Sequence, residues 1–94
     1  MKKLEPDQIT KNLQDFKDWS VNDNYIEKNF TFKDFSEAFA FMTRVATIAE
    51  TLNHHPDWCN VYNKVTIKLS THDAKGITDK DFLFAEKVEQ LFIR

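Results

Sequence analysis

The chain has 94 residues, 41% of them hydrophobic and 14% aromatic, a composition that favours a single packed domain over residues 1–94 and excludes a disordered chain. Its 13 basic and 15 acidic residues give a formal net charge of -2, so it lacks the basic excess that direct nucleic-acid binding draws on. No apolar run approaches the roughly 20 residues that span a bilayer, and no apolar signal segment is recognisable, so we expect a cytoplasmic protein without membrane contact.

Two residue types that often carry chemistry are scarce. The only glycine is Gly76, which excludes the glycine-rich loops that bind dinucleotides and triphosphates. The only cysteine is Cys59, which excludes an internal disulfide and a thiolate metal cluster. We expect Cys59 to be a small core residue without a redox role.

The first part of the chain predicts a short helix followed by a hairpin. Over Pro6–Phe16 the apolar residues are spaced by four and three, as in an amphipathic helix. One strand is expected around Trp19–Val21 and a second over Tyr25–Phe32, where apolar and polar residues alternate. Turn formers at positions 22–24 connect the two strands. Lys28 is the one residue that interrupts the apolar face of the second strand.

The middle of the chain carries the strongest helical pattern, with apolar residues three and four apart from Phe35 to Leu52. Asp34 is positioned to cap the start of this helix. The helix is expected to end near Asn53, because Pro56 disfavours the helical conformation of the residue before it.

The last third of the chain predicts a second hairpin and a final helix. Trp58–Tyr62 and Val65–Thr71 are short strand-like runs separated by Asn63-Lys64. After a loop, Thr78 and Asp81 form a capping pair before an amphipathic helix. The order helix, hairpin, helix, hairpin, helix predicts an α+β domain with a four-stranded antiparallel sheet, covered by helices on one face and open on the other.

All three histidines fall near the ends of these predicted elements. His54 and His55 lie where the long helix ends, and His72 lies where the fourth strand ends. Helix C-termini carry partial negative charge and favour a protonated imidazole, an effect that Glu50, four residues before His54, would reinforce. Because the ends of neighbouring elements can meet over one pocket, the histidines indicate a shared site that could exchange protons.

Each of these residues also has a purely structural interpretation. His54 and His55 can simply cap a helix C-terminus, His72 can be a solvated loop residue, and Asp81 can serve only in its capping pair. A metal site is another alternative for a histidine cluster. We expect no metal, because adjacent histidines usually point apart, no HExxH motif is present and only one thiol exists to help.

Four segments together resemble a known family. They are the motif from Glu50 to Pro56, which reads Glu-Thr-Leu-Asn-His-His-Pro, the following Trp58–Tyr62, the segment Leu69-Ser70-Thr71-His72, and Asp81. In these segments the chain is similar to the pterin-4a-carbinolamine dehydratases, known in animals also as a dimerization cofactor of a homeodomain transcription factor. The likeness runs over nearly the whole chain, and it is least distinct in the N-terminal third.

The resemblance implies an α+β fold with a four-stranded antiparallel sheet and assembly as homodimers or homotetramers. The implied substrate is 4a-hydroxytetrahydropterin, the product left when an aromatic amino-acid hydroxylase has used its pterin. Dehydration of this compound yields quinonoid dihydropterin. The resemblance implies that neither a metal nor an organic cofactor is needed.

Position by position, the resemblance implies that His54 and His72 carry the acid–base chemistry and that His55 chiefly holds the pterin. Glu50 and Asp81 match acidic positions that border the pterin pocket.

The resemblance leaves two points open. Lys80 stands where the family often has arginine. An arginine could make a bidentate contact there, whereas the lysine ammonium is a point charge, so the role of Lys80 stays open. The alternative function is a protein-binding module on the same scaffold, or a structural oligomer with a decayed site. Retention of all three histidines at the family spacing favours the enzyme, because a binding role would not require them.

Overall fold

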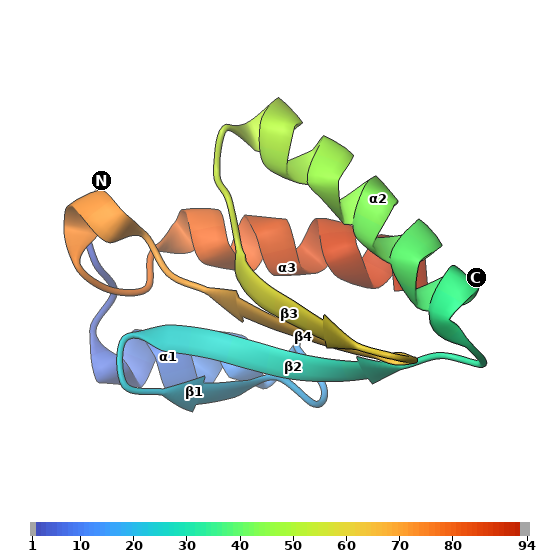
Figure 1. Cartoon of the computed structure of the whole chain (residues 1–94). Helices are drawn as coiled ribbons and strands as arrows, with labels where there is room; N and C mark the ends of the chain where they lie inside the picture. Colours follow the sequence, from blue (N-terminus) through green and yellow to red (C-terminus); the bar gives the residue numbers. More distant parts are fainter. Residues whose placement is uncertain (1, 93–94) are drawn as a thin grey trace.

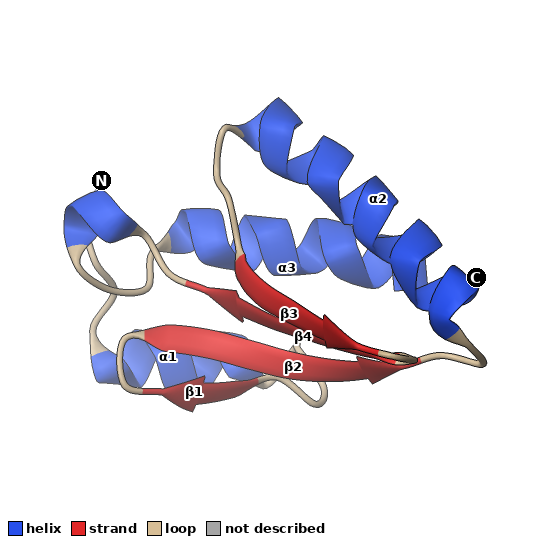
Figure 2. Cartoon of the chain, viewed as in Figure 1, coloured by secondary structure: helices blue, strands red, loops and turns tan. Residues whose placement is uncertain are grey.

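A computed structural model describes residues 2–92 (Figure 1). Its elements, in chain order, are α1 (Pro6–Leu13), β1 (Ser20–Asn22), β2 (Tyr25–Thr31), α2 (Phe35–Leu52), β3 (Asp57–Val61), β4 (Lys64–Leu69), the 3-10 turn η1 (His72–Ala74) and α3 (Asp79–Phe92). The strands form one antiparallel sheet in the order β1-β2-β4-β3. Figure 2 shows the strands as one layer with α2 and α3 side by side against it.

The core lies between this sheet and the helices, because alternate residues of the two central strands face the helices. The inward residues are paired across β2 and β4 as Ile26 with Leu69, Lys28 with Ile67, and Phe30 with Val65. All six are buried, whereas the residues between them are at most partly buried. This alternation confirms the predicted α+β fold, in which one face of the sheet is covered and the other is open.

Lys28 interrupts the apolar pattern because it forms an ion pair inside the core. Its side chain is 9% exposed, and its Nζ atom lies 2.7 Å from Oε2 of Glu89 on α3. The same carboxylate oxygen accepts a hydrogen bond from Nε1 of Trp19 at 2.8 Å. The ammonium also lies 4.9 Å from the ring centroid of Phe30, in a cation–π contact. The positive charge of the buried ammonium is therefore balanced by the Glu89 carboxylate and by the face of the Phe30 ring.

Three local predictions were wrong in part. The first helix ends at Leu13 rather than Phe16, because the chain continues in tighter turns whose N–H groups bond three residues back. The second hairpin turns at Tyr62 and Asn63 rather than at Asn63 and Lys64, because Lys64 already pairs with Val61. Strand boundaries elsewhere differ by one or two residues.

The expectation that Cys59 is a core residue was also wrong. In β3 the side chains alternate, and Trp58 and Asn60 are the partly buried ones. Cys59 has the opposite orientation and is exposed on the open face of the sheet. A polar asparagine at an inward position hides this pattern in the sequence.

Helix α2 ends in a defined turn that determines where the chain goes next. Asn53 adopts the left-handed conformation, with φ 51° and ψ 48°. Its N–H donates to the carbonyl of Glu50 at 3.3 Å, and the N–H of His54 donates to the carbonyl of Ala49 at 3.0 Å. These two bonds make a Schellman motif, which satisfies the last carbonyls of the helix. The turn directs His54 back into the protein.

The substitution Asn53→Ala should lower the free energy of unfolding by about 1 kcal/mol, because alanine lacks the local hydrogen bonding that makes the left-handed region accessible to asparagine. Asn53→Gly should change it by less, since glycine adopts this conformation without a steric penalty. Urea denaturation of both variants measures the difference. Equal stabilities would show that the backbone of residue 53 is not held left-handed.

Candidate active site

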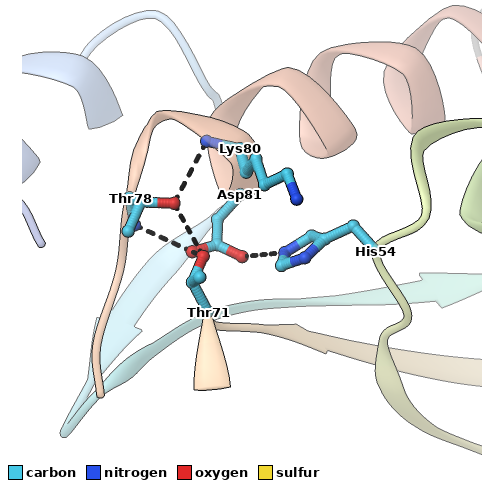
Figure 3. A network of polar contacts seen from close by, with 5 residues as sticks. All are labelled: His54, Thr71, Thr78, Lys80 and Asp81. Carbon is cyan, nitrogen blue, oxygen red and sulfur yellow. Dashed lines mark hydrogen bonds and ion pairs between the residues drawn. The ribbon is translucent and has the colours of Figure 1, made fainter. Parts of the chain in front are cut away.

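The side chain of His54 is buried and paired with a carboxylate. Its Nε2 atom lies 2.6 Å from Oδ1 of Asp81, in the first turn of α3 (Figure 3). The His54 side chain is 9% exposed and that of Asp81 is fully buried. The imidazole also packs against the Phe84 ring in a T-shaped arrangement, with 6.1 Å between ring centroids. Segments 27 residues apart are therefore joined by a short polar contact inside the core.

The second carboxylate oxygen of Asp81 accepts two further hydrogen bonds. The N–H of Thr78 donates to Oδ2 at 2.8 Å, and the hydroxyl of Thr71 donates to it at 3.0 Å. The contact with Thr78 confirms the predicted capping pair at the start of α3. Asp81 therefore caps the helix, as predicted, and it also contacts His54, which was not predicted.

These bonds decide which ring nitrogen of His54 carries a proton. An ionised Asp81 only accepts hydrogen bonds, so the proton of the His54 contact belongs to Nε2. In the neutral imidazole Nδ1 then holds a free lone pair. Nδ1 has no partner among residues 2–92, and no fully buried side-chain nitrogen or oxygen there lacks one. Nδ1 is therefore not sealed from solvent, and its lone pair is free of protein partners within residues 2–92.

His55 has a different environment although it is the next residue. Its Nε2 atom lies 2.6 Å from Oε2 of Glu50, and the two side chains are 57% and 79% exposed. A contact this exposed contributes little to stability. It places the imidazole beside Glu50, near the C-terminal end of α2.

His55 and His72 line the same small hollow. It has a volume of about 160 Å³, and its walls come from the two hairpins and the segments that follow α2 and β4. The lining residues are Tyr25, His55, Asp57, Lys68, Ser70 and His72. Two imidazoles, an ammonium, a carboxylate, a phenol and a hydroxyl therefore surround a space that a small polar molecule could enter.

The structure divides the predicted site residues into two groups. His54 and Asp81 form the buried pair, whereas His55 and His72 line the hollow, and Glu50 reaches the hollow only through His55. Thr71 connects the groups, because its hydroxyl bonds Asp81 and its backbone continues into His72. The roles predicted for these five residues stay predictions. The ammonium of Lys80 has no partner among residues 2–92, and its backbone N–H donates to Thr78.

Several residues of this region were not predicted from the sequence. Tyr25, Asp57 and Lys68 lie on the open face of the sheet, and nothing in the sequence assigned them to a site. The antiparallel register brings Asp57 opposite Lys68, and the Lys68 ammonium lies 5.1 Å from the Tyr25 ring. A correct pairing of the three strands would have been the signal that places them together.

The rest of the described chain offers fewer groups suited to proton transfer. A shallower groove of about 840 Å³ lies between α1 and α3, but its lining contains no histidine, lysine or cysteine. No three histidine, cysteine, aspartate or glutamate side chains within residues 2–92 are grouped so that they could hold a metal ion. None of the helices in the same range is both long enough and apolar enough to cross a bilayer.

The fold and the histidines define a small α+β domain with side chains suited to proton transfer. The sequence model of the family "Pterin 4 alpha carbinolamine dehydratase" matches residues 2–91. The chain belongs to this family. A relative from Sulfurisphaera tokodaii, provisionally named a pterin-4-alpha-carbinolamine dehydratase, is 50% identical over 97% of this chain and 98% of its own length. A relative of the same name from Mesorhizobium japonicum is 50% identical over 96% of this chain and 94% of its own.

Solved structures agree with this assignment. The crystal structure of a transcriptional coactivator/pterin dehydratase from Brucella melitensis matches with a TM-score of 0.92 and 38% identity, covering 95% of this chain and 97% of the other. A pterin dehydratase-like protein identified as a RuBisCO assembly factor in the alpha-carboxysome has a TM-score of 0.65 and 22% identity, over 78% of this chain and 84% of that one. The second likeness shows the fold alone.

Proposed function

We propose that this protein is a hydro-lyase that dehydrates 4a-hydroxytetrahydropterin to quinonoid dihydropterin, by histidine acid–base chemistry without a metal. The observation that carries the proposal is the buried His54–Asp81 pair, which leaves Nδ1 of His54 without a partner in residues 2–92 but not sealed from solvent. It is supported by the family match over residues 2–91. The substrate would come from an aromatic amino-acid hydroxylase.

The reaction needs one proton given and one taken. A protonated imidazole donates its proton to the 4a-hydroxyl group, the C4a–O bond breaks and water leaves. The N5–H proton of the pterin is removed by a second imidazole, and the N5–H bonding electrons form the N5=C4a double bond. We assign these steps to His54 and His72, and we assign His55 and Glu50 to holding the ring. Positioned groups that carry protons in this way typically contribute about 10²–10⁴-fold in rate.

The size of the hollow limits how the substrate is held. At about 160 Å³ it is smaller than the roughly 300–1,000 Å³ of a pocket that encloses a drug-sized ligand. Only part of a bicyclic pterin would be enclosed by one copy of the chain. We propose that the rest of the ring lies on the surface, or against a second copy in a homodimer or homotetramer.

The proposal is tested by following dehydration of chemically generated 4a-hydroxytetrahydropterin with and without the purified protein. The protein should raise the rate well above that of the blank. His72→Ala should lower kcat by roughly a hundredfold, the lower end of the range for acid–base groups, because His72 is exposed to solvent.

Asp73→Asn is the matched control for His72→Ala. Asp73 is the next residue of the same turn, it is exposed, and it does not line the hollow, so its substitution should leave the rate unchanged. If the rate of dehydration with the native protein is no higher than that of the blank, the proposed enzymatic function is wrong. Equal rates for the native protein and His72→Ala would remove His72 from the mechanism.

A second candidate function is protein binding, and one surface favours it. Phe35 and Phe39 on the outer side of α2 are 49% and 56% exposed, with ring centroids 5.8 Å apart. The Brucella melitensis neighbour is described as a transcriptional coactivator as well as a pterin dehydratase. We propose this helix face as the docking surface of such a role. Binding of that kind would be unchanged in His72→Ala, whereas kcat would fall by the roughly hundredfold given above.

A further inference from the structure

Thr71 and Thr78 form a chain of hydrogen bonds that ends on the partner of His54. Their hydroxyl oxygens lie 2.6 Å apart, and Thr71 continues the contact to Oδ2 of Asp81 (Figure 3). We propose that these two threonines are positioning residues, which hold the Asp81 carboxylate so that His54 keeps its proton on Nε2. The catalytic consequence rests on the proposed function, whereas the effect on His54 does not.

The direction of every bond in the chain follows from counting protons. Thr71 has one hydroxyl proton, which it donates to Asp81. In the contact between the hydroxyls the donor must therefore be Thr78. The oxygen of Thr78 in turn accepts from the backbone N–H of Lys80 at 3.2 Å. Every hydrogen bond of this series is therefore donated in the same direction, from the backbone of α3 to Thr78, from Thr78 to Thr71 and from Thr71 to Asp81.

The opposite direction is unfavourable. If Thr71 donated to Thr78, the Thr71 oxygen would present a lone pair to Oδ2 of Asp81 at 3.0 Å. The hydroxyl proton of Thr78 would then have no acceptor among residues 2–92. A buried donor without a partner and two opposed lone pairs are both costly in a low-dielectric interior.

Burial restricts the motion of these hydrogen-bonded side chains. Thr78 and Asp81 are fully buried, and Thr71 is 8% exposed, so water does not compete freely for these groups. The backbone of Thr71 is tied to Gly76 by a bridge, with its N–H donating to the Gly76 carbonyl at 2.8 Å. The backbone N–H of Thr78 is bound to Asp81. The carboxylate plane is therefore held by two donors on one oxygen, and the other oxygen is left for His54.

The first test is a measurement of the imidazole itself. Long-range proton–nitrogen NMR of histidine-labelled protein, at a pH where His54 is neutral, should show the Nε2–H tautomer almost alone. In Thr71→Val, which keeps the shape and removes the hydroxyl, a measurable fraction of the Nδ1–H tautomer should appear. Thr71→Ser keeps the hydroxyl and should restore the native spectrum. An unchanged tautomer in folded Thr71→Val would overturn the proposal.

The second test reads out catalysis. Thr71→Val should lower kcat roughly tenfold with KM nearly unchanged, since a misplaced proton carrier affects the reaction more than substrate binding. Thr71→Ser should recover most of the rate, and equal kcat values for the native protein and Thr71→Val would count against positioning. A protein without dehydratase activity would end the proposed function and leave the NMR result to decide the role of the threonines.

A third measurement needs no substitution and covers the case in which Thr71→Val does not fold. In the native protein, the hydroxyl protons of Thr71 and Thr78 should exchange slowly enough with water to give separate NMR signals. Their cross-peaks should place the Thr78 proton next to the Thr71 oxygen and the Thr71 proton next to Asp81. Rapid exchange of both hydroxyl protons would show that no such chain exists.

Discussion

Asp81→Asn should leave the fold intact and lower kcat for pterin dehydration by about 10²–10⁴-fold, close to the loss expected on removing His54 itself. The substitution changes one atom of the side chain and keeps its volume. It changes which hydrogen bonds that side chain can make.

The orientation of the new amide is dictated by its neighbours. The position of Oδ2 receives hydrogen bonds from the N–H of Thr78 and the hydroxyl of Thr71, so the amide oxygen must stand there. The amide NH2 group then faces Nε2 of His54, where Oδ1 stood. It donates to Nε2 and forces the imidazole proton onto Nδ1. The nitrogen that reaches solvent thereby loses its lone pair.

The rate of dehydration and the NMR tautomer of His54 check this prediction together. Asp79→Asn is the matched control, because Asp79 lies in the same turn of α3 and is exposed. It should leave both quantities unchanged. If Asp81→Asn retained the native rate while its His54 proton had moved to Nδ1, then His54 would not be one of the proton carriers.

Of the substitutions predicted here, Glu89→Ala should lower the free energy of unfolding the most, by about 3 kcal/mol. It leaves the ammonium of Lys28 in the core without a counter-charge, and it leaves Nε1 of Trp19 without an acceptor. Breaking a buried ion pair from one side typically costs about 3–5 kcal/mol. The lower end applies here, because the Glu89 side chain is 21% exposed and water can reach it.

Chemical denaturation measures this loss, with Glu86→Ala as the matched control. Glu86 is an exposed glutamate one turn earlier on α3, so its removal should change the free energy of unfolding by less than about 0.5 kcal/mol. Adding Lys28→Met to Glu89→Ala should recover much of the loss, because the stranded charge is removed with its partner. Equal effects of Glu89→Ala and Glu86→Ala would mean that the pair does not hold Lys28.

The features that could be predicted from the sequence are those determined by residues close together in the chain. The bounds of α2 follow from an apolar repeat of 18 residues, a capping aspartate at its start and Pro56 after its end. The pair of Thr78 and Asp81 was recognisable because a capping box spans only four positions. The fold class followed from these local elements and their order.

What could not be predicted depends on contacts between distant segments. Lys28 and Glu89 are 61 residues apart, and His54 and Asp81 are 27 apart, so neither bond leaves a trace in a local pattern. The division of the histidines was hidden for the same reason. Adjacent residues were expected to point apart, but only the left-handed turn at Asn53 determines that His54 is the one that turns inward.

Asp81 both caps α3 and contacts His54, and this affects what the presence of the same aspartate in a relative can indicate. Because the same carboxylate caps α3 and binds His54, a lineage that abandoned the chemistry would still be selected to keep the aspartate for folding. Its presence in a relative therefore reports on the helix, not on catalysis. His72 is exposed and bonds no side chain among residues 2–92, so drift would erase it first. Under the proposed mechanism, in which His72 carries a proton, position 72 is thus the better marker for separating active dehydratases from members kept for binding alone.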